Sequence, residues 1–268
     1  MIDLLILGST GMLGNAVTKH FSELEGFKVH VTHRGDMTLK KDSIYFDASQ
    51  PDFDTLPSVD YVINCIGTIK PFMSSNMPKS IQINAVFPYE LAKYYSDKKT
   101  KVIHITTDCV FSGDDGNYSE ESFHDCRDNY GKSKSLGEPA DCMVLRTSII
   151  GREIHKNASL VSWAISQKNK KVNGFTNHFW NGITTNQYAK CCQQIIENNL
   201  YETGTRHLFS NSVSKYELLE TISNNLKLDL EISAFEAPQS CDRTLGTVHE
   251  LCAELKIPTI KKQIEEMR

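Results

Sequence analysis

Tyr130 and Lys134 stand four positions apart, so in a helix both side chains lie on one face. A tyrosine hydroxyl with a pKa near ~10 is a poor proton donor at neutral pH, but a cation within ~4–6 Å can lower that pKa by ~1–3 units. Lys134 supplies the cation, and Thr107 offers a hydroxyl that can hydrogen-bond a substrate oxygen. The three residues suit proton transfer to a carbonyl. Tyr-x-x-x-Lys alone is common, so its meaning depends on the rest of the chain.

A glycine-rich turn near the start of the chain adds the second part of this chemistry. Gly8 suits a tight turn, Gly11 lets the backbone approach a pyrophosphate, and Gly14 allows close helix packing. The turn follows an apolar run and opens an amphipathic stretch, which is the context that a dinucleotide site requires, although an ordinary strand-to-helix turn is the alternative. The cofactor contacts predicted here are Gly8, Ser9, Thr10, Gly11, Met12 and Leu13. Lys134 would also hold the nicotinamide ribose.

The choice of cofactor depends on the residues after the second apolar run. A free ribose 2′-hydroxyl usually meets a carboxylate there, whereas a 2′-phosphate prefers an arginine. His33 and Arg34 come first and Asp36 follows two places later, which favours NADPH, with NADH as the alternative. Arg34 as a solvated surface residue stays open. Asp47 either accepts a hydrogen bond from the adenine amine or forms a turn.

The elements that position these motifs alternate along the first half of the chain. Short apolar runs predict buried parallel strands, and the two stretches between them with helical spacing of apolar residues predict helices at 12–24 and 78–95. The strands are expected at 4–7, 28–32, 61–65, 102–105 and 143–145. This alternation predicts an α/β fold, a Rossmann-type doubly wound parallel sheet with a smaller C-terminal substrate-binding lobe.

We expect a cofactor-binding domain over 1–150 and a substrate-binding lobe over 151–268, with part of 184–212 packing back on the first domain. The lobe should cover the carboxyl edge of the sheet. The stretch 173–185 is rich in turn residues and predicts a binding loop. Helices are expected at 158–168, 184–197, 214–226, 247–254 and 259–267, and strands at 207–209 and 230–232.

Charge and composition exclude several classes of function. The net charge is −4 with no basic tract, which argues against nucleic-acid binding. The longest apolar run has four residues, far below the ~20 that cross a bilayer, so we expect no membrane contact and a cytoplasmic location. The eight cysteines show no zinc-like spacing and are interpreted as free thiols, with no metal site.

The chain resembles the extended branch of the short-chain dehydrogenase/reductase superfamily, and within it the dTDP-4-dehydrorhamnose reductase family. The resemblance rests on the glycine-rich turn and on segments 64–67, 83–85, 106–113, 130–138 and 145–151. It implies a catalytic set of Thr107, Tyr130 and Lys134, and a substrate cleft between the lobes. The further cofactor contacts that we place on these segments are Cys65, Ile66, Gly67 and Thr106.

The same resemblance implies substrate contacts in the C-terminal half. Arg243 would bind the diphosphate, with a surface salt bridge to Asp242 or to another nearby acidic residue as the alternative. Asn177 and Trp180 would touch the substrate, or else serve a structural role. Related dehydratases carry a glutamate where this chain has Cys109, and cysteine cannot replace it as a base, so dehydration is disfavoured.

The implied function is NAD(P)H-dependent reduction of the C4 ketone of a nucleotide-linked 4-keto-6-deoxysugar, a step in the synthesis of surface polysaccharide precursors. The alternatives are a C4-epimerase of nucleotide sugars, which retains its cofactor, and a non-catalytic nucleotide-binding regulatory subunit. Retention of Thr107, Tyr130 and Lys134 argues against the regulatory reading, because a binding module needs no proton donor. The expected partner is the nucleotide sugar, and a homodimer is compatible with the sequence.

Overall fold

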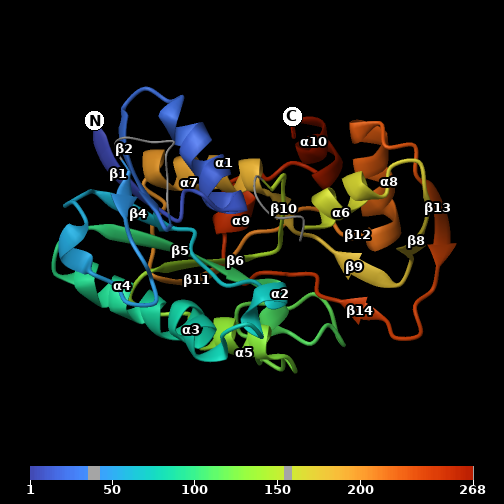
Figure 1. Ribbon diagram of the computed structural model, residues 1–268, viewed down its shortest axis with the longest axis horizontal. Coiled ribbons are helices and arrows are strands. Elements are labelled where there is room, and N and C mark those ends of the chain that lie inside the picture. The colour runs from blue at the N-terminus through green and yellow to red at the C-terminus, as the bar shows by residue number, and fades with distance from the viewer. Residues whose placement is uncertain (36–42, 154–158, 268) are drawn as a thin grey trace.

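A seven-stranded sheet forms the centre of the protein, and the computed structural model describes residues 1–35, 43–153 and 159–267 (Figure 1). The strand order is β11-β6-β5-β4-β1-β2-β3, and neighbouring strands pair in parallel. The strands are β1 (Ile2–Leu7), β2 (Phe27–His33), β3 (Ile44–Tyr45), β4 (Tyr61–Asn64), β5 (Lys101–Thr107), β6 (Met143–Thr147) and β11 (Gly204–His207). The order reverses at β1, as in a doubly wound Rossmann sheet, and confirms the predicted fold class.

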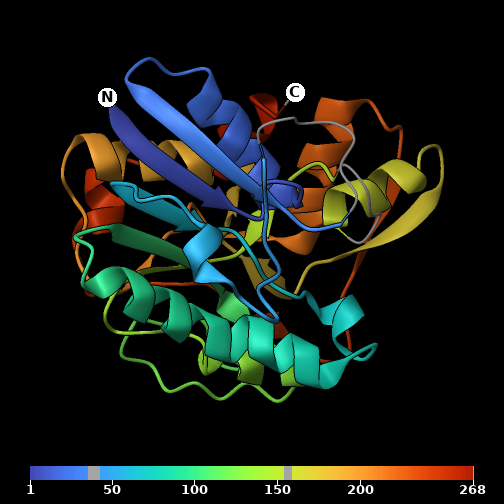
Figure 2. The ribbon, with the colours of Figure 1, turned by 60° about the vertical axis from the view of Figure 1, so that its left-hand side comes forward.

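Helices cover both faces of this sheet (Figure 2). In β1, Leu4 and Ile6 join the core beneath α1 (Met12–Ser22) and α7 (Thr185–Glu197), because side chains alternate between the faces of a strand. Leu5 joins the opposite core beneath α4 (Phe87–Ser96). The shorter helices of this part are α2 (Lys70–Met73), α3 (Met77–Ile81), α5 (Asn129–Ser135) and α9 (Leu251–Glu254), with 3-10 turns at Phe53–Thr55 and Asp108–Val110.

The helix predicted at 78–95 is interrupted. A π-helical turn at Gln82–Val86 separates α3 from α4. Pro88 lies in the first turn of α4, where a proline ring cannot donate a backbone hydrogen bond to the preceding turn. Asn84 of the π turn accepts a hydrogen bond from Thr68 N at 2.8 Å and donates to Ser133 Oγ at 3.1 Å, which ties the chain after β4 to α5. The irregular turn therefore positions two segments of the predicted site.

A smaller lobe lies beside the sheet, at the right of Figure 1. Its core contains Val161, Trp180, Leu218 and Ile264. Its helices are α6 (Leu160–Ser166), α8 (Lys215–Leu226) and α10 (Ile260–Glu265), and its short strands are β7 (Ile149–Ile150), β8 (Lys171–Phe175), β9 (His178–Trp180), β10 (Ile183–Thr184), β12 (Val213–Ser214), β13 (Glu231–Phe235) and β14 (Cys241–Asp242).

The prediction of a loop over 173–185 is wrong, because this stretch contains the end of β8 and the whole of β9 and β10. β8 pairs with β13, and β9 pairs with β12 and β14. These partners lie far along the chain, so no local pattern reveals them. The helix predicted at 247–254 is shorter in the structure, where α9 spans only Leu251–Glu254. The strand predicted at 207–209 lies earlier in the chain, because β11 spans Gly204–His207.

α7 and β11 lie with the large sheet although they follow the start of the second half. β11 pairs with β6, and Tyr188 and Ile195 of α7 pack in the core that contains Leu13 and Phe21 of α1. The division into domains at 1–150 and 151–268, with part of 184–212 returned to the first, remains our proposal. None of the described helices has the length and apolar character needed to cross a membrane.

Candidate active site

The first turn of α5 carries Tyr130 beside the end of β5. Asp128 caps this helix, because its carboxylate accepts a hydrogen bond from Gly131 N at 2.9 Å, and Lys70 pairs with the same carboxylate at 2.8 Å. A Cβ atom at Gly131 would lie 2.2 Å from the carbonyl oxygen of Cys109. Glycine at this position therefore lets α5 pack directly against the segment that follows β5.

Thr107 is the last residue of β5 and is buried. Its hydroxyl is 3.1 Å from the Asp108 carboxylate and accepts a hydrogen bond from Cys109 N at 3.2 Å. Burial raises the pKa of Tyr130 above its ordinary value, and a hydrogen bond with Thr107 acts in the opposite direction. The lowered Tyr130 pKa expected from the sequence is thus not what the structure shows. Tyr130 therefore keeps its proton at neutral pH and is a weaker acid than a free tyrosine.

Lys134 follows Tyr130 by one helical turn and is buried. Its ammonium group donates a hydrogen bond to the Ile105 carbonyl at 2.9 Å. Burial lowers the pKa of Lys134 to about 8, against the opposing effect of the Glu138 carboxylate. The amine can therefore change its protonation state near physiological pH.

The glycine-rich turn lies between β1 and α1. A Cβ atom at Gly14 would lie 2.1 Å from the Gly8 carbonyl oxygen, so the helix packs against the turn as the sequence predicted. At Gly11 the nearest atom outside its chain neighbours is that same oxygen at 3.5 Å, so this position has free space. Gly8 has a φ of +80°, which favours glycine.

Ser9 holds this turn against the end of β2. Its hydroxyl donates to the Thr32 carbonyl at 2.8 Å, and Gly8 N donates to the Thr32 hydroxyl at 3.0 Å. Leu13 is buried in the core, so its side chain serves packing. Gly11 N donates to the Gly8 carbonyl at 3.0 Å, so among the predicted cofactor residues the backbone amides of Thr10 and Met12 remain at the start of α1.

The start of α1 fits a dinucleotide pyrophosphate. The helix has no side-chain cap and no acidic residue in its first turn, so its first amides and the positive end of its dipole are available to an anion. Ile66 lies beside this turn, since a Cβ at Gly8 would be 2.8 Å from its side chain, and it follows Cys65 and precedes Gly67 at the end of β4. Thr106 on β5 carries a buried hydroxyl without a hydrogen-bond partner in the described part of the chain.

The residues predicted to select the cofactor lie around the end of β2. Arg34 is exposed, and His33 is within 2.9 Å of the Ser43 hydroxyl. Asp36 lies outside the described residues. Asp47 accepts hydrogen bonds from Ser49 N and Oγ at 3.0 and 2.8 Å, which is a turn-forming arrangement. Its adenine contact remains a proposal.

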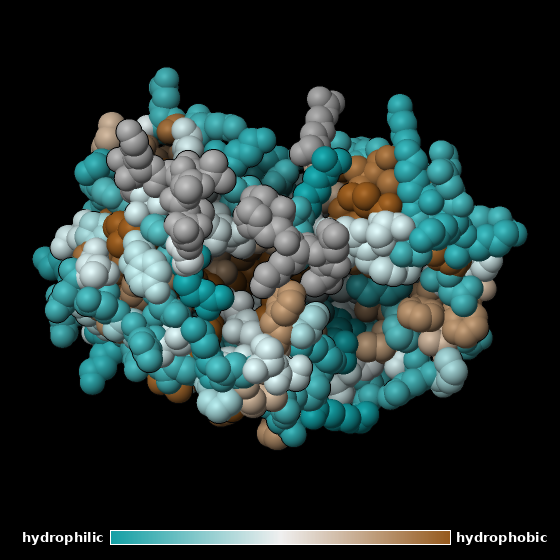
Figure 3. All heavy atoms as spheres, viewed as in Figure 1, coloured by the Kyte–Doolittle hydropathy of each residue, from teal (hydrophilic) through white to brown (hydrophobic). Residues whose placement is uncertain are grey.

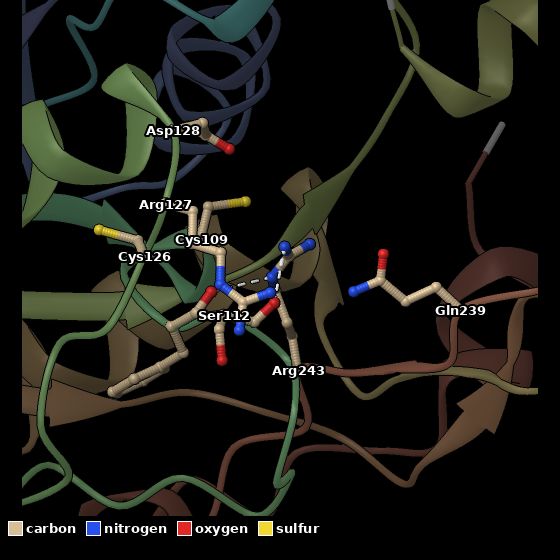
Figure 4. A pocket seen from close by; sticks show the side chains of 8 residues that line it. Cys109, Ser112, Cys126, Arg127, Asp128, Gln239 and Arg243 are labelled. Atoms are coloured by element: carbon tan, nitrogen blue, oxygen red, sulfur yellow. Dashed lines mark hydrogen bonds between the residues drawn. The ribbon is translucent and has the colours of Figure 1, made fainter.

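A cavity of ≈ 310 Å³ lies where the segment after β5 and the segment before α5 meet the residues around β14 (Figure 4). Its lining residues are Cys109, Phe111, Ser112, Cys126, Arg127, Asp128, Gln239 and Arg243. Arg243 donates to the carbonyls of Phe111 and Ser112 at 3.0 and 2.9 Å. The alternative salt bridge to Asp242 does not form, because the Asp242 carboxylate accepts hydrogen bonds from Thr244 instead. Arg243 thus lines this cavity, and its contact with a substrate diphosphate remains a prediction.

Asn177 and Trp180 make contacts within the smaller lobe that stabilise its fold. The Asn177 amide donates to the Ala237 carbonyl at 2.8 Å and accepts from Ala237 N at 2.9 Å. Trp180 is 3% exposed and packs in the core of the smaller lobe. The sequence left this alternative open, and these contacts favour it over direct substrate contact.

A second cavity of ≈ 320 Å³ lies in the smaller lobe, where Figure 3 shows hydrophobic surface over α6 and α8. It is lined by Leu160, Trp163, Asn173, Gly174, Phe175, His178, Lys215 and Leu219. The sequence did not single out Lys215 or Gln239, because neither belongs to a recognisable motif.

In the described ranges, histidine, cysteine and carboxylate side chains form no group that could hold a metal ion.

Comparison with known sequences matches residues 2–246 to the family model described as "RmlD substrate binding domain". Methionine adenosyltransferase 2 subunit beta from Bos taurus is 26% identical over 244 residues, covering 84% of this chain and 72% of that protein. The probable low-salt glycan biosynthesis reductase Agl14 from Haloferax volcanii is 30% identical over 157 residues, covering 54% of this chain and 52% of that protein.

Solved structures share the fold over nearly the whole chain. A dTDP-4-dehydrorhamnose reductase from Bacillus anthracis, in complex with NADP, superposes with a TM-score of 0.78 at 18% identity, covering 100% of this chain and 98% of that one. A UDP-glucuronic acid 4-epimerase from Bacillus cereus, in complex with NAD, gives a TM-score of 0.76 at 13% identity, covering 99% and 95%. At these identities the likeness shows the fold alone.

Proposed function

Because the chain belongs to the RmlD substrate binding domain family, we propose that it is an NAD(P)H-dependent reductase of the C4 ketone in a nucleotide-linked 4-keto-6-deoxysugar. The observation that carries this proposal is that Tyr130 hydrogen-bonds Thr107 at the end of β5, while Lys134, one turn further along α5, bonds the Ile105 carbonyl of the same strand. A cavity holding Arg243 lies beside them. The same arrangement supports the coarser assignment to sugar-nucleotide reductases and epimerases.

In this proposal Tyr130 donates its proton to the ketone oxygen. Burial keeps the Tyr130 hydroxyl protonated, and its hydrogen bond with Thr107 aligns the donor. Thr107 offers a second hydroxyl to the same oxygen. Lys134 is held by its hydrogen bond to the Ile105 carbonyl and lies on the helix face that carries Tyr130. Its positive charge stabilises the negative charge that forms on the Tyr130 oxygen when the proton leaves.

A nicotinamide cofactor, when bound, supplies the hydride that reduces the carbonyl carbon. The backbone amides at the start of α1 would hold its pyrophosphate, and Gly11 leaves the space for it. Lys134 has donors left for the nicotinamide ribose. We assign NADPH because Arg34 follows β2, with NADH as the alternative. The NADP and NAD complexes of the two structural neighbours support this pair of cofactors.

The test is a substrate panel. Freshly prepared UDP-, dTDP- and GDP-4-keto-6-deoxysugars are offered with NADPH or NADH, and cofactor oxidation is followed by absorbance. A reductase consumes one cofactor for each product molecule. An epimerase, our alternative, turns over with a catalytic amount of cofactor and interconverts the fully reduced sugars. Absence of cofactor consumption with every member of the panel contradicts the reductase.

A regulatory role is the second candidate, and the similarity to methionine adenosyltransferase 2 subunit beta favours it. A regulatory subunit would bind nucleotide without turnover and would change the activity of a partner enzyme. Tyr130 would then be dispensable.

We also propose a cytoplasmic location, which is supported by the eight cysteines, all described and all free.

A further inference from the structure

Lys215 is the first residue of α8, and it lies in an unfavourable electrostatic position. The N-terminal end of a helix carries partial positive charge, so a cation there is repelled. The acidic residue nearby does not compensate for this repulsion. Glu217 accepts hydrogen bonds from Ser214 N and Oγ at 2.7 and 2.9 Å, and so completes the capping box of the helix.

The Lys215 ammonium has no carboxylate partner. Among the ion pairs of the described residues, none includes Lys215, and its one recorded contact is with the Trp180 ring, 5.0 Å from the ring centre. Burial lowers the pKa of Lys215, which shows that the charged form is partly desolvated. The Asp108 carboxylate favours the charged form but makes no ion pair with Lys215, so it offsets only part of the cost of desolvating the ammonium. Packing alone therefore does not explain this lysine.

Lys215 lines the second cavity, which adjoins the first where His178 Nε2 is 3.0 Å from the Gln239 carbonyl. Trp163 and Phe175 line the same cavity of the smaller lobe. The charges that act on it include Asp108 and Arg243, and Arg243 lines the cavity beside Tyr130. A ligand that extends from one cavity to the other would pass Lys215.

Arg243 is a second cation without a carboxylate partner in the described part of the chain. Its Nε and one terminal nitrogen donate to backbone carbonyls, and the other terminal nitrogen has no recorded protein partner. Lys215 and Arg243 are close enough for their charges to interact. The Asp108 carboxylate acts on both cations and Asp128 also acts on Arg243, but neither carboxylate forms an ion pair with them. Lys215 and Arg243 therefore keep donors for an anionic ligand with more than one charge.

We propose that Lys215 binds the diphosphate of the nucleotide-linked substrate, acting together with Arg243. This inference rests on the proposed function and adds a residue to it. A diphosphate suits this pair of residues, because its two phosphates can meet two separate cations. An ammonium group suits this role, since it attracts phosphate oxygens without a fixed orientation.

The test measures binding by calorimetry, with no turnover involved. The parent and Lys215→Met are titrated with UDP, dTDP and GDP, and then with uridine, thymidine and guanosine. Lys215→Met keeps the length of the side chain and removes its charge. We expect the affinity for the nucleoside diphosphates to fall about 10- to 100-fold and the affinity for the nucleosides to change less than threefold. Lys227→Met, at the exposed far end of α8, is the matched control and should bind as the parent does.

Thermal unfolding separates this role from a structural one. Without ligand, the melting temperature of Lys215→Met should equal or exceed that of the parent, because a partly buried charge that forms no ion pair is removed. Lys215→Arg, which keeps the charge, should retain nucleoside diphosphate affinity within about fivefold. Equal binding of UDP, dTDP and GDP by the parent and Lys215→Met overturns the role of Lys215 and leaves the proposed function intact. Failure of the parent to bind any nucleoside diphosphate overturns both.

Discussion

Lys134 donates a hydrogen bond to the carbonyl oxygen of Ile105 at 2.9 Å. This contact joins α5, which carries Tyr130, to β5, which carries Thr107. An ammonium group has three donors, so two remain for a ribose or a substrate. The cost of the arrangement is burial of the charge, which lowers the pKa of Lys134 to about 8.

The first prediction concerns the dependence of activity on pH. If the charged form of Lys134 is required, kcat/KM falls as pH rises through about 8, because the amine loses its proton there. Lys134→Arg keeps its charge at every accessible pH and should move this limb upward, although its overall rate is lower. Initial rates between about pH 6 and 9.5 test this. A flat profile for the parent contradicts the role of the charge.

The second prediction isolates the proton donor. Tyr130→Phe keeps the aromatic ring and removes the hydroxyl, so we expect turnover to fall by about 10²–10⁴-fold with cofactor affinity unchanged. Single-turnover rates and cofactor titration measure the two effects separately. A kcat within threefold of the parent would show that another group supplies the proton. That result would also favour the regulatory candidate.

The third prediction compares two glycines in one turn. Gly11 has an extended backbone, with φ of −78° and ψ of 168°, and free space around a Cβ, so Gly11→Val should fold normally and lose NADPH binding. Gly14→Ala places a Cβ 2.1 Å from the Gly8 oxygen and should lower the free energy of unfolding by about 1–3 kcal/mol. Calorimetry and thermal unfolding of both variants test this contrast. Unchanged NADPH affinity in Gly11→Val means that the turn holds no dinucleotide.

The sequence predicted the large sheet and its glycine turn because these depend on local patterns. Apolar strands, the turn residues and Tyr130 with Lys134 are each encoded within a few positions. The smaller lobe was predicted less well, because β9 pairs with strands from distant parts of the chain. Trp180 is aromatic in a polar stretch, which resembles a binding residue until its core neighbours are known. Lys215 was missed for the same reason, since its sequence neighbours do not reveal its burial.

The fourth prediction follows from a buried histidine. Arg146 Nη1 donates to His207 Nε2 at 2.8 Å, and His207 Nδ1 is 2.7 Å from the Gly246 carbonyl, so His207 must be neutral with its proton on Nδ1. Burial, together with the positive charge of Arg146, lowers the His207 pKa from 6.5 to about 4. Below pH 6.5 the unfolded chain binds a proton that the folded protein excludes, so stability falls as pH drops to about 4.

The His207 pKa difference between the folded and unfolded states corresponds to about 3 kcal/mol of unfolding free energy. His207→Gln can still accept from Arg146 but does not titrate, so its stability should depend less on pH over this range. Urea unfolding at several pH values measures the slope, with His249→Gln as the matched control. An equal loss of stability in His207→Gln and the parent would assign the acid sensitivity to other groups.

The last prediction concerns the choice between NADPH and NADH. Arg34 is exposed just after β2, at the edge of the glycine turn, because Gly8 N and Ser9 bind Thr32 two residues earlier. If its guanidinium pairs with the 2′-phosphate of NADPH, the charge-assisted contact contributes about 1.5–3 kcal/mol, or one to two decades of affinity. Arg34→Ala should then weaken NADPH far more than NADH.

His33 can supply part of the same contact, which would reduce the difference, so His33→Ala and the double variant belong in the series. The measurement is kcat/KM with each cofactor. Equal losses for NADPH and NADH in Arg34→Ala would make Arg34 a solvated surface charge and would remove the sequence argument for NADPH.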